Sequence, residues 1–301
     1  MVTLNSAALD LVLHQLYVHF PVPGGLVRAV DGVDICFRHQ QITGIIGESG
    51  CGKSVLGQAI LGILPDYVAR SGNIFYRSTD ILADNTSLPG FYGQQIALIP
   101  QNPGDSLNPL RTIGRQFDDI LQTAGLNDKT NQRKQQLLTF FGLPDAERVL
   151  AAYPHELSGG MLQRVLCAMS ICCSPLWLLA DEPTKGLDET ACGVVYENLQ
   201  KIKTSQSLGM LIITHDLQLA RSICADIAVM YAGQIVEYGP QVLTGPRPSI
   251  YPGFLGSTAG KRLSAAAWPA AITAGSFARL SVCAAMPQLS KTLSAGSPAC
   301  L

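Results

Sequence analysis

The stretch Gly47-Glu48-Ser49-Gly50-Cys51-Gly52-Lys53-Ser54 follows an apolar run, Ile42–Ile46, and precedes Val55–Leu64, whose apolar residues recur with helical spacing. It matches the phosphate-loop pattern G-x-x-x-x-G-K-[ST]. Glycines at these positions let successive backbone N–H groups turn toward phosphate oxygens, and a helix that begins at Lys53 directs its positive end at the same anion. Lys53 can reach the β- and γ-phosphates, and Ser54 can ligate Mg²⁺. Because a strand precedes the loop and a helix follows it, a chance glycine-rich turn is the weaker interpretation.

Two carboxylates, Asp181 and Glu182, follow a second apolar run, Leu176–Ala180. An acidic side chain at the end of a buried strand can hold Mg²⁺ through water, and a neighbouring carboxylate can polarise an attacking water. Taken alone, this pattern is explained better by chance or by a helix N-cap. Together with the phosphate loop, it predicts a nucleotide site that uses Mg²⁺.

Alternating strand and helix signals predict an α/β fold, a phosphate-loop NTPase core with a mixed, mainly parallel sheet. The uninterrupted apolar runs Leu176–Ala180 and Leu211–Thr214 are typical of parallel strands that are buried on both faces. Residues 11–46 read as short strands and turns, with one turn at Asp31-Gly32, and we expect an antiparallel β subdomain here. Residues from about 102 to 157 are expected to form an all-helical insert.

Composition limits the class of protein. The chain has 301 residues, of which 47% are hydrophobic and 14% charged, so a sizeable core is expected. The net charge of −1 argues against a nucleic-acid partner. Nine cysteines without a C-x-x-C spacing indicate reduced thiols. No apolar run reaches the roughly 18–20 residues that span a bilayer, and the N-terminus lacks signal-peptide features. We therefore expect a soluble chain; if it serves a membrane, it does so by docking on other subunits.

The composition changes after about residue 240. The segment 241–301 contains no Asp or Glu and is rich in Ala, Ser, Pro and Gly. We predict a folded domain over residues 1–257 and a poorly ordered or loosely packed tail over 258–301.

Three further features decide which class of nucleotide enzyme this is. Leu157-Ser158-Gly159-Gly160-Met161 lies between the two motifs above, Gln101 follows the apolar run Ile96–Ile99, and His215 follows Leu211–Thr214. Singly, each has an ordinary structural explanation. In this order they make the chain resemble, over about residues 12–240, the ATP-binding subunits of ABC transporters. The family's L-S-G-G-Q signature is matched here with methionine in place of glutamine.

The resemblance implies a role for each matching residue. Glu182 corresponds to the catalytic glutamate, His215 to the switch histidine, Gln101 to the Q-loop glutamine, and Gly186-Leu187-Asp188 to the D-loop. The implied catalytic residues are Glu182, His215, Lys53 and Gln101, and the implied Mg²⁺ ligands are Ser54, Gln101 and Asp181. ATP would lie between the phosphate loop of one domain and Ser158, Gly159 and Gly160 of a second domain packed head to tail. The adenine would stack on Tyr17 or Phe20.

The resemblance also implies partners and a location. The expected partners are a second ATP-binding subunit, forming a heterodimer, two integral-membrane permease subunits and, indirectly, an extracytoplasmic substrate-binding protein. The chain would lie at the cytoplasmic face of the inner membrane. ATP and Mg²⁺ are the expected cofactors.

Short segments narrow the resemblance to importers of dipeptides, oligopeptides and nickel. These are Ser106-Leu107-Asn108-Pro109-Leu110 and Tyr153-Pro154-His155-Glu156. Leu61–Pro65 and Met161–Arg164 resemble the nickel importer most, so nickel or a metal chelate is favoured over peptide, with both left open. A soluble ABC protein without a permease, a phosphate-loop GTPase or kinase, and an exporter are the rival hypotheses. The single cassette argues against a soluble ABC protein, and the signature argues against a GTPase or kinase. The two segments named above argue against an exporter.

Overall fold

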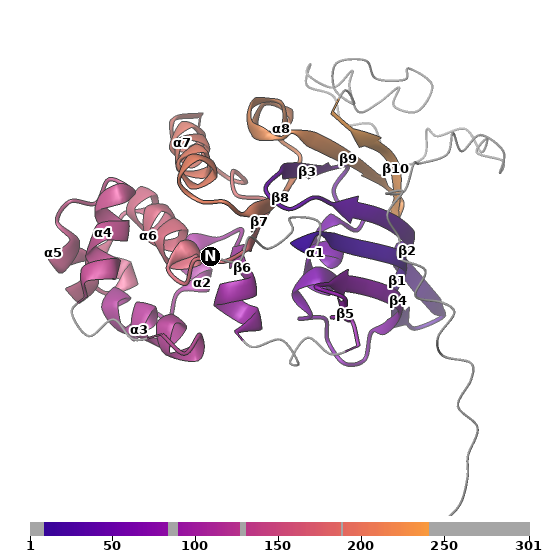
Figure 1. Cartoon of the computed structure of the whole chain (residues 1–301), viewed down its shortest axis with the longest axis horizontal. Coiled ribbons are helices and arrows are strands. Elements are labelled where there is room, and N and C mark those ends of the chain that lie inside the picture. The colour runs from indigo at the N-terminus through magenta and orange to yellow at the C-terminus, as the bar shows by residue number, and fades with distance from the viewer. Residues whose placement is uncertain (1–8, 84–89, 127–130, 188, 241–301) are drawn as a thin grey trace, which may run out of the picture. The chain divides into compact units, whose positions relative to one another are not determined.

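The computed structural model describes residues 9–83, 90–126, 131–187 and 189–240. Two sheets and a helical region account for most of this part of the chain (Figure 1). The predicted tail, 258–301, and Asp188 lie outside the described residues. None of the helices described combines the length and the apolar character that crossing a membrane requires.

Ten strands form the two sheets. They are β1 (Leu11–Val22), β2 (Gly25–Phe37), β3 (Ile42–Ile46), β4 (Ala69–Tyr76), β5 (Thr79–Asp80), β6 (Ile96–Ile99), β7 (Trp177–Asp181), β8 (Gly209–Thr214), β9 (Asp226–Tyr231) and β10 (Gln234–Gly239).

The larger sheet has the order β10-β9-β3-β8-β7-β6. Its strands pair in parallel except β10, which pairs antiparallel with β9. The smaller sheet, β2-β1-β4-β5, is antiparallel throughout. The predicted fold class, a mainly parallel mixed sheet with an antiparallel β subdomain, is confirmed.

One predicted turn is wrong. Asp31-Gly32 lies inside β2, where Leu16 of β1 pairs with Val33 and Tyr17 pairs with Asp31. Gly32 is therefore the extra residue of a β-bulge, and its φ of 74° is the positive value that glycine tolerates. A glycine after an aspartate has the same sequence signature in a turn and in a bulge, so the sequence could not distinguish them.

Eight α-helices are described. They are α1 (Lys53–Leu61), α2 (Pro103–Ser106), α3 (Ile113–Thr123), α4 (Gln132–Phe140), α5 (Ala146–Ala151), α6 (Gly159–Ile171), α7 (Glu189–Ser205) and α8 (Leu217–Ile223). A short irregular turn, Phe91–Gln95, in which Tyr92 and Gly93 have non-helical backbone, precedes β6, and a 3₁₀ turn, Pro154–Glu156, precedes α6. Among the described residues between β6 and α6, the regular structure is helical, as predicted.

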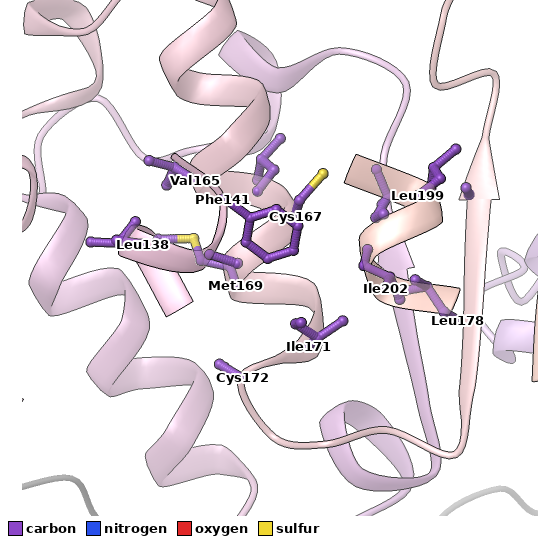
Figure 2. Close-up of a cluster of buried hydrophobic side chains, with 14 of the residues drawn as sticks. Leu138, Phe141, Val165, Cys167, Met169, Ile171, Cys172, Leu178, Leu199 and Ile202 are labelled. Carbon is purple, nitrogen blue, oxygen red and sulfur yellow. The ribbon is translucent and has the colours of Figure 1, made fainter. Parts of the chain in front are cut away.

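A continuous apolar core joins the helical insert to the larger sheet. Figure 2 shows Leu138 and Phe141 beside residues of α6, with Leu178 of β7 and Ile202 of α7 on the other side of that helix. All four side chains are buried. Helix α1 contributes to a second core, formed with β1, β2 and the opposite face of the larger sheet. The helix after the phosphate loop is therefore held between the two sheets.

Candidate functional site

The carboxyl ends of four neighbouring parallel strands, β3, β8, β7 and β6, meet at one edge of the larger sheet. The loops that leave this edge carry the phosphate loop Gly47–Ser54, His215, the pair Asp181-Glu182, and Gln101. Motifs that are scattered along the sequence are thus brought together by strand order. Ligands of open α/β sheets bind at this edge.

Two glycines of the phosphate loop have no room for a side chain. A Cβ added at Gly52 would lie 2.0 Å from the carbonyl oxygen of Ala29 in β2, and Gly52 has a φ of 109°. A Cβ added at Gly47 would lie 2.2 Å from the carbonyl oxygen of Met230 in β9. The strands on either side therefore press the loop backbone into its curve, and this explains why the pattern requires glycine here.

Lys53 begins α1 and its ammonium lies against the loop. The side chain is 5% exposed, and Nζ donates hydrogen bonds of 2.9 Å to the carbonyl oxygens of Gly47 and Glu48. Burial raises the pKa of the neighbouring Cys51 thiol, so this thiol stays neutral beside the lysine. The ammonium and the amino end of α1 together provide positive potential for an anion.

Ser54 and Asp181 form an oxygen pair that suits a hard cation. Ser54 Oγ donates to Asp181 Oδ1 over 3.1 Å. Burial raises the pKa of Asp181, while the Ser54 hydrogen bond and the Lys53 ammonium oppose this shift. A hydroxyl beside a carboxylate is the kind of ligand set that Mg²⁺ takes next to a phosphate, so these residues fit the implied ion. Gln101, two residues beyond β6, is placed at the same edge by the pairing of β6 with β7.

Glu182 and His215 contact each other. Glu182 Oε2 lies 2.5 Å from His215 Nδ1, and the exposed fractions of the two side chains are 10% and 53%. The backbone of Glu182 is left-handed, with a φ of 48°, and its N–H donates to the carbonyl oxygen of Ile213 in β8 over 2.8 Å. Such a conformation costs a non-glycine residue about 1–3 kcal/mol, and it is found mainly where function requires it. The carboxylate is thereby directed at the loop that carries the histidine.

The signature residues lie apart from this site. Ser158 caps α6 by accepting a hydrogen bond from the Met161 N–H over 3.3 Å. Gly159 and Gly160 are exposed, and a Cβ on either would meet nothing within 4 Å. Within the part of the chain that the structure describes, no hydrogen bond or ion pair joins these three residues to the phosphate loop.

The aromatic candidates for the adenine have contacts of their own. The Tyr17 hydroxyl donates to Gln15 Oε1 over 3.1 Å, and its ring packs edge-on against His19. Phe20 is half-buried against the core of the β subdomain. Either residue remains a prediction for the adenine contact.

Sequence reasoning missed Tyr196. Its hydroxyl donates to the carboxylate of Asp216, the residue after His215. Tyr196 belongs to no motif, and a tyrosine on an amphipathic helix is ordinarily a packing residue. Its contact with the site depends on how α7 and α8 pack, which helical spacing alone does not predict.

A phosphate loop, a hydroxyl–carboxylate pair for Mg²⁺ and a buried glutamate beside a histidine, all at one edge of a parallel sheet, define a phosphate-loop NTPase. A sequence model of the family described as "ABC transporter" matches residues 30–185. The chain belongs to this family, whose ATPase domains bind ATP.

Curated relatives agree with this assignment. The dipeptide transport ATP-binding protein DppD of Bacillus subtilis (strain 168) is 38% identical over 255 residues, which cover 82% of this chain and 76% of the relative. The oligopeptide transport ATP-binding protein OppD of Haemophilus influenzae is 37% identical over 232 residues, covering 76% of this chain and 72% of the relative.

Solved structures confirm the fold. A dimeric ATP-binding cassette in a post-hydrolysis state, bound to ADP and phosphate, superposes with a TM-score of 0.67 at 22% identity, covering 76% of this chain and 98% of that chain. CbiO1 of Clostridium perfringens, part of the ABC transporter complex CbiONQ, superposes with a TM-score of 0.62 at 24% identity. The match covers 78% of this chain and 89% of that chain.

Proposed function

We propose that this chain is the ATP-hydrolysing subunit of an ABC importer for peptides, attached to the cytoplasmic face of the membrane through permease subunits. The observation that carries the proposal is the sheet edge where Lys53, the pair Asp181-Glu182 and His215 meet. The relatives named for dipeptide and oligopeptide transport support the cargo class.

The proposed chemistry follows from the contacts at this edge. Lys53 and the amino end of α1 bind the phosphates, and Glu182 orients the attacking water and takes up its proton. His215, in contact with Glu182, holds that carboxylate and contacts the γ-phosphate. Bound Mg²⁺, held by Ser54 and Asp181, supplies charge neutralisation on the phosphates. Positioning and electrostatics provide most of the rate in phosphoryl transfer, so these contacts suffice without a covalent intermediate.

A second ATP-binding subunit completes the proposed site. Ser158 caps a helix whose exposed N-terminus is suited to an anion, yet that helix does not serve the phosphate loop of the same chain. A partner packed head to tail would present its own signature there. The family resemblance favours a related subunit as this partner, which would make the pair a heterodimer.

A groove beside Gln101 is the proposed contact with the permease. It encloses about 650 Å³ between the edge strand β6 and the helical insert, and its lining includes Leu98, Pro100, Leu107 and Arg111. Since the groove is lined by both the core and the insert, a permease helix seated in it would respond to movements between them.

The nickel preference inferred from short segments finds no support in these relatives. It rested on a few residues, such as Leu61–Pro65, whereas the similarity to the dipeptide protein extends over 255 residues. Because an ATPase subunit does not touch the cargo, the cargo is tested in cells. Deleting the gene should reduce uptake of a radiolabelled dipeptide and leave uptake of radioactive Ni²⁺ unchanged; the reverse result would assign the transporter to nickel.

Nucleotide binding itself is tested with Lys53→Ala. This change should weaken the affinity for Mg-ATP by about tenfold or more, because it removes a charge-assisted contact to phosphate. Titration of a fluorescent ATP analogue measures it, with Lys201→Ala on the half-buried face of α7 as the control. Unaltered affinity in Lys53→Ala would refute the assignment of the phosphate loop.

A further inference from the structure

Asp216 anchors the chain directly after His215. Its Oδ1 accepts hydrogen bonds from the N–H groups of Gln218 and Leu219, at 2.9 and 3.0 Å, and so caps α8. Its own N–H donates to Thr214 Oγ1 over 2.9 Å. The remaining oxygen, Oδ2, accepts from the hydroxyl of Tyr196 in α7.

His215 depends on these anchors for its position. Its side chain is half-exposed, so packing restrains the ring little, and its Nδ1 contacts Glu182. The direction of the imidazole is therefore set mainly by the backbone between Thr214 and Asp216. The hydrogen bonds that Asp216 makes with Thr214, Gln218 and Leu219 are local to this turn, whereas the one from Tyr196 comes from another helix.

The same helix also holds the loop that follows Glu182. Cys192 lies one turn before Tyr196 in α7, and its Sγ is 3.8 Å from the carbonyl oxygen of Thr184 and 3.9 Å from that of Leu187. Residues four apart lie on one face of a helix. One face of α7 thus contacts the segments that carry both members of the Glu182–His215 pair.

We propose that Tyr196 is a positioning residue, which through Asp216 holds His215 in register with Glu182 for hydrolysis. The inference rests on the ATPase function proposed above. Burial and the adjoining Asp216 carboxylate raise the pKa of Tyr196 well above its usual value, so the hydroxyl remains a donor at any working pH. A movement of α7 would therefore shift Glu182 and His215 together.

The test compares Tyr196→Phe with Tyr238→Phe in the full chain. The control removes an equivalent hydroxyl, which donates to Asp226 and to the carbonyl oxygen of Cys36 beyond the site. Tyr196→Phe should lower kcat by about tenfold and change KM for ATP by less than about twofold, because the phosphate loop is untouched. Tyr238→Phe should retain kcat, with a comparable change in Tm. Equal kcat in the two variants, with wild-type turnover present, would overturn the proposal.

A second readout does not depend on turnover. The ring ¹⁵N signals of His215, assigned with His215→Gln, should shift or broaden in Tyr196→Phe and stay in place in Tyr238→Phe. Unmoved signals would also overturn the positioning role. A wild-type chain that binds no ATP would instead refute the proposed function, and the histidine signals would still test the position of His215.

Discussion

Glu182 combines three properties that rarely occur together in one residue. It is buried, its backbone is left-handed, and its carboxylate contacts a histidine that is half-exposed. Burial keeps the acceptor away from bulk water, while the exposed histidine can meet a ligand. The strain is maintained by the hydrogen bond from the Glu182 N–H to β8. These features separate Glu182 from its neighbour Asp181, which faces Ser54.

At this scale we expect Glu182→Gln to retain ATP binding and to lose turnover by on the order of a hundredfold or more, the typical contribution of a positioned acid–base group. Glutamine keeps the shape and one acceptor but cannot take a proton from water. Steady-state phosphate release and nucleotide titration measure the two effects. Glu197→Gln, an exposed carboxylate of α7, is the matched control. Turnover that persists in Glu182→Gln would exclude the role given to this carboxylate.

The common placement of these residues at one sheet edge was predictable because each follows an apolar run. Asp181, Glu182 and His215 stand at strand ends that the sequence marks clearly, and parallel strands place such ends at one edge. The Ser54–Asp181 contact follows from the same rule. Tyr196 was not predictable, since its role depends on helix packing. The left-handed backbone of Glu182 was not predictable either, because glutamate gives no sign of positive φ.

At the scale of elements, an apolar run predicts a buried strand, whereas the buried face of a helix depends on how the helix packs. Ile42–Ile46 matches β3 as expected. Phe140, at the end of α4, is 40% exposed, whereas the adjacent Phe141 is buried. Adjacent aromatic residues at a helix end cannot share one face, so packing selects Phe141 for the core.

The helical insert contains a buried lysine in α4, which forms an ion pair with α3. The side chain of Lys134 is 2% exposed, and its Nζ lies 2.5 Å from Asp118 Oδ1, whose side chain is 57% exposed. Asp118→Ala removes one charged partner of a buried ammonium, and it should lower the free energy of unfolding by about 1–2 kcal/mol. Urea unfolding measures this change.

The adjacent residue provides the control. Asp119 pairs with Arg111 over 2.9 Å, but both side chains are more than two-fifths exposed. Exposed ion pairs contribute about 0–1 kcal/mol, so Asp119→Ala should have the smaller effect. A larger loss in Asp119→Ala than in Asp118→Ala would contradict the importance of burial here.

At the scale of the whole molecule, His39 joins the two sheets. It follows β2, its ring packs edge-on against Trp177 of β7 with the ring centroids 6.0 Å apart, and its backbone N–H donates to Asp10 Oδ1. Burial lowers its pKa below the unfolded value of 6.5, against the opposing influence of the Leu176 backbone and Asp10. The unfolded chain therefore binds the proton more tightly. Stability is complete above pH 6.5 and declines as the pH falls through and below that value.

His39→Gln should flatten this part of the pH dependence, although it also removes packing against Trp177. Urea midpoints at about pH 5.5 and about pH 7.5 should differ less in the variant than in the unaltered chain. His155→Gln, at an exposed site, should leave the difference unchanged. If the urea midpoint changed by the same amount between the two pH values in the unaltered chain, His39→Gln and His155→Gln, the acid sensitivity would come from other groups.

Because Ser158–Gly160 lie apart from the phosphate loop, we predict that two chains together build each ATP site. Lys53→Ala damages the phosphate loop, and Gly160→Asp places a negative charge where the open N-terminus of α6 would face phosphate. Each variant alone should be inactive. If copies of this chain pair head to tail, a mixed pair contains one site built from two intact halves, so an equal mixture should recover at most about a quarter of wild-type turnover. A mixture that stays inactive, when the wild-type chain alone is active, would exclude shared sites between copies. A wild-type chain that turns over only after a related subunit is added would show that the intact signature comes from that subunit, as the predicted heterodimer requires.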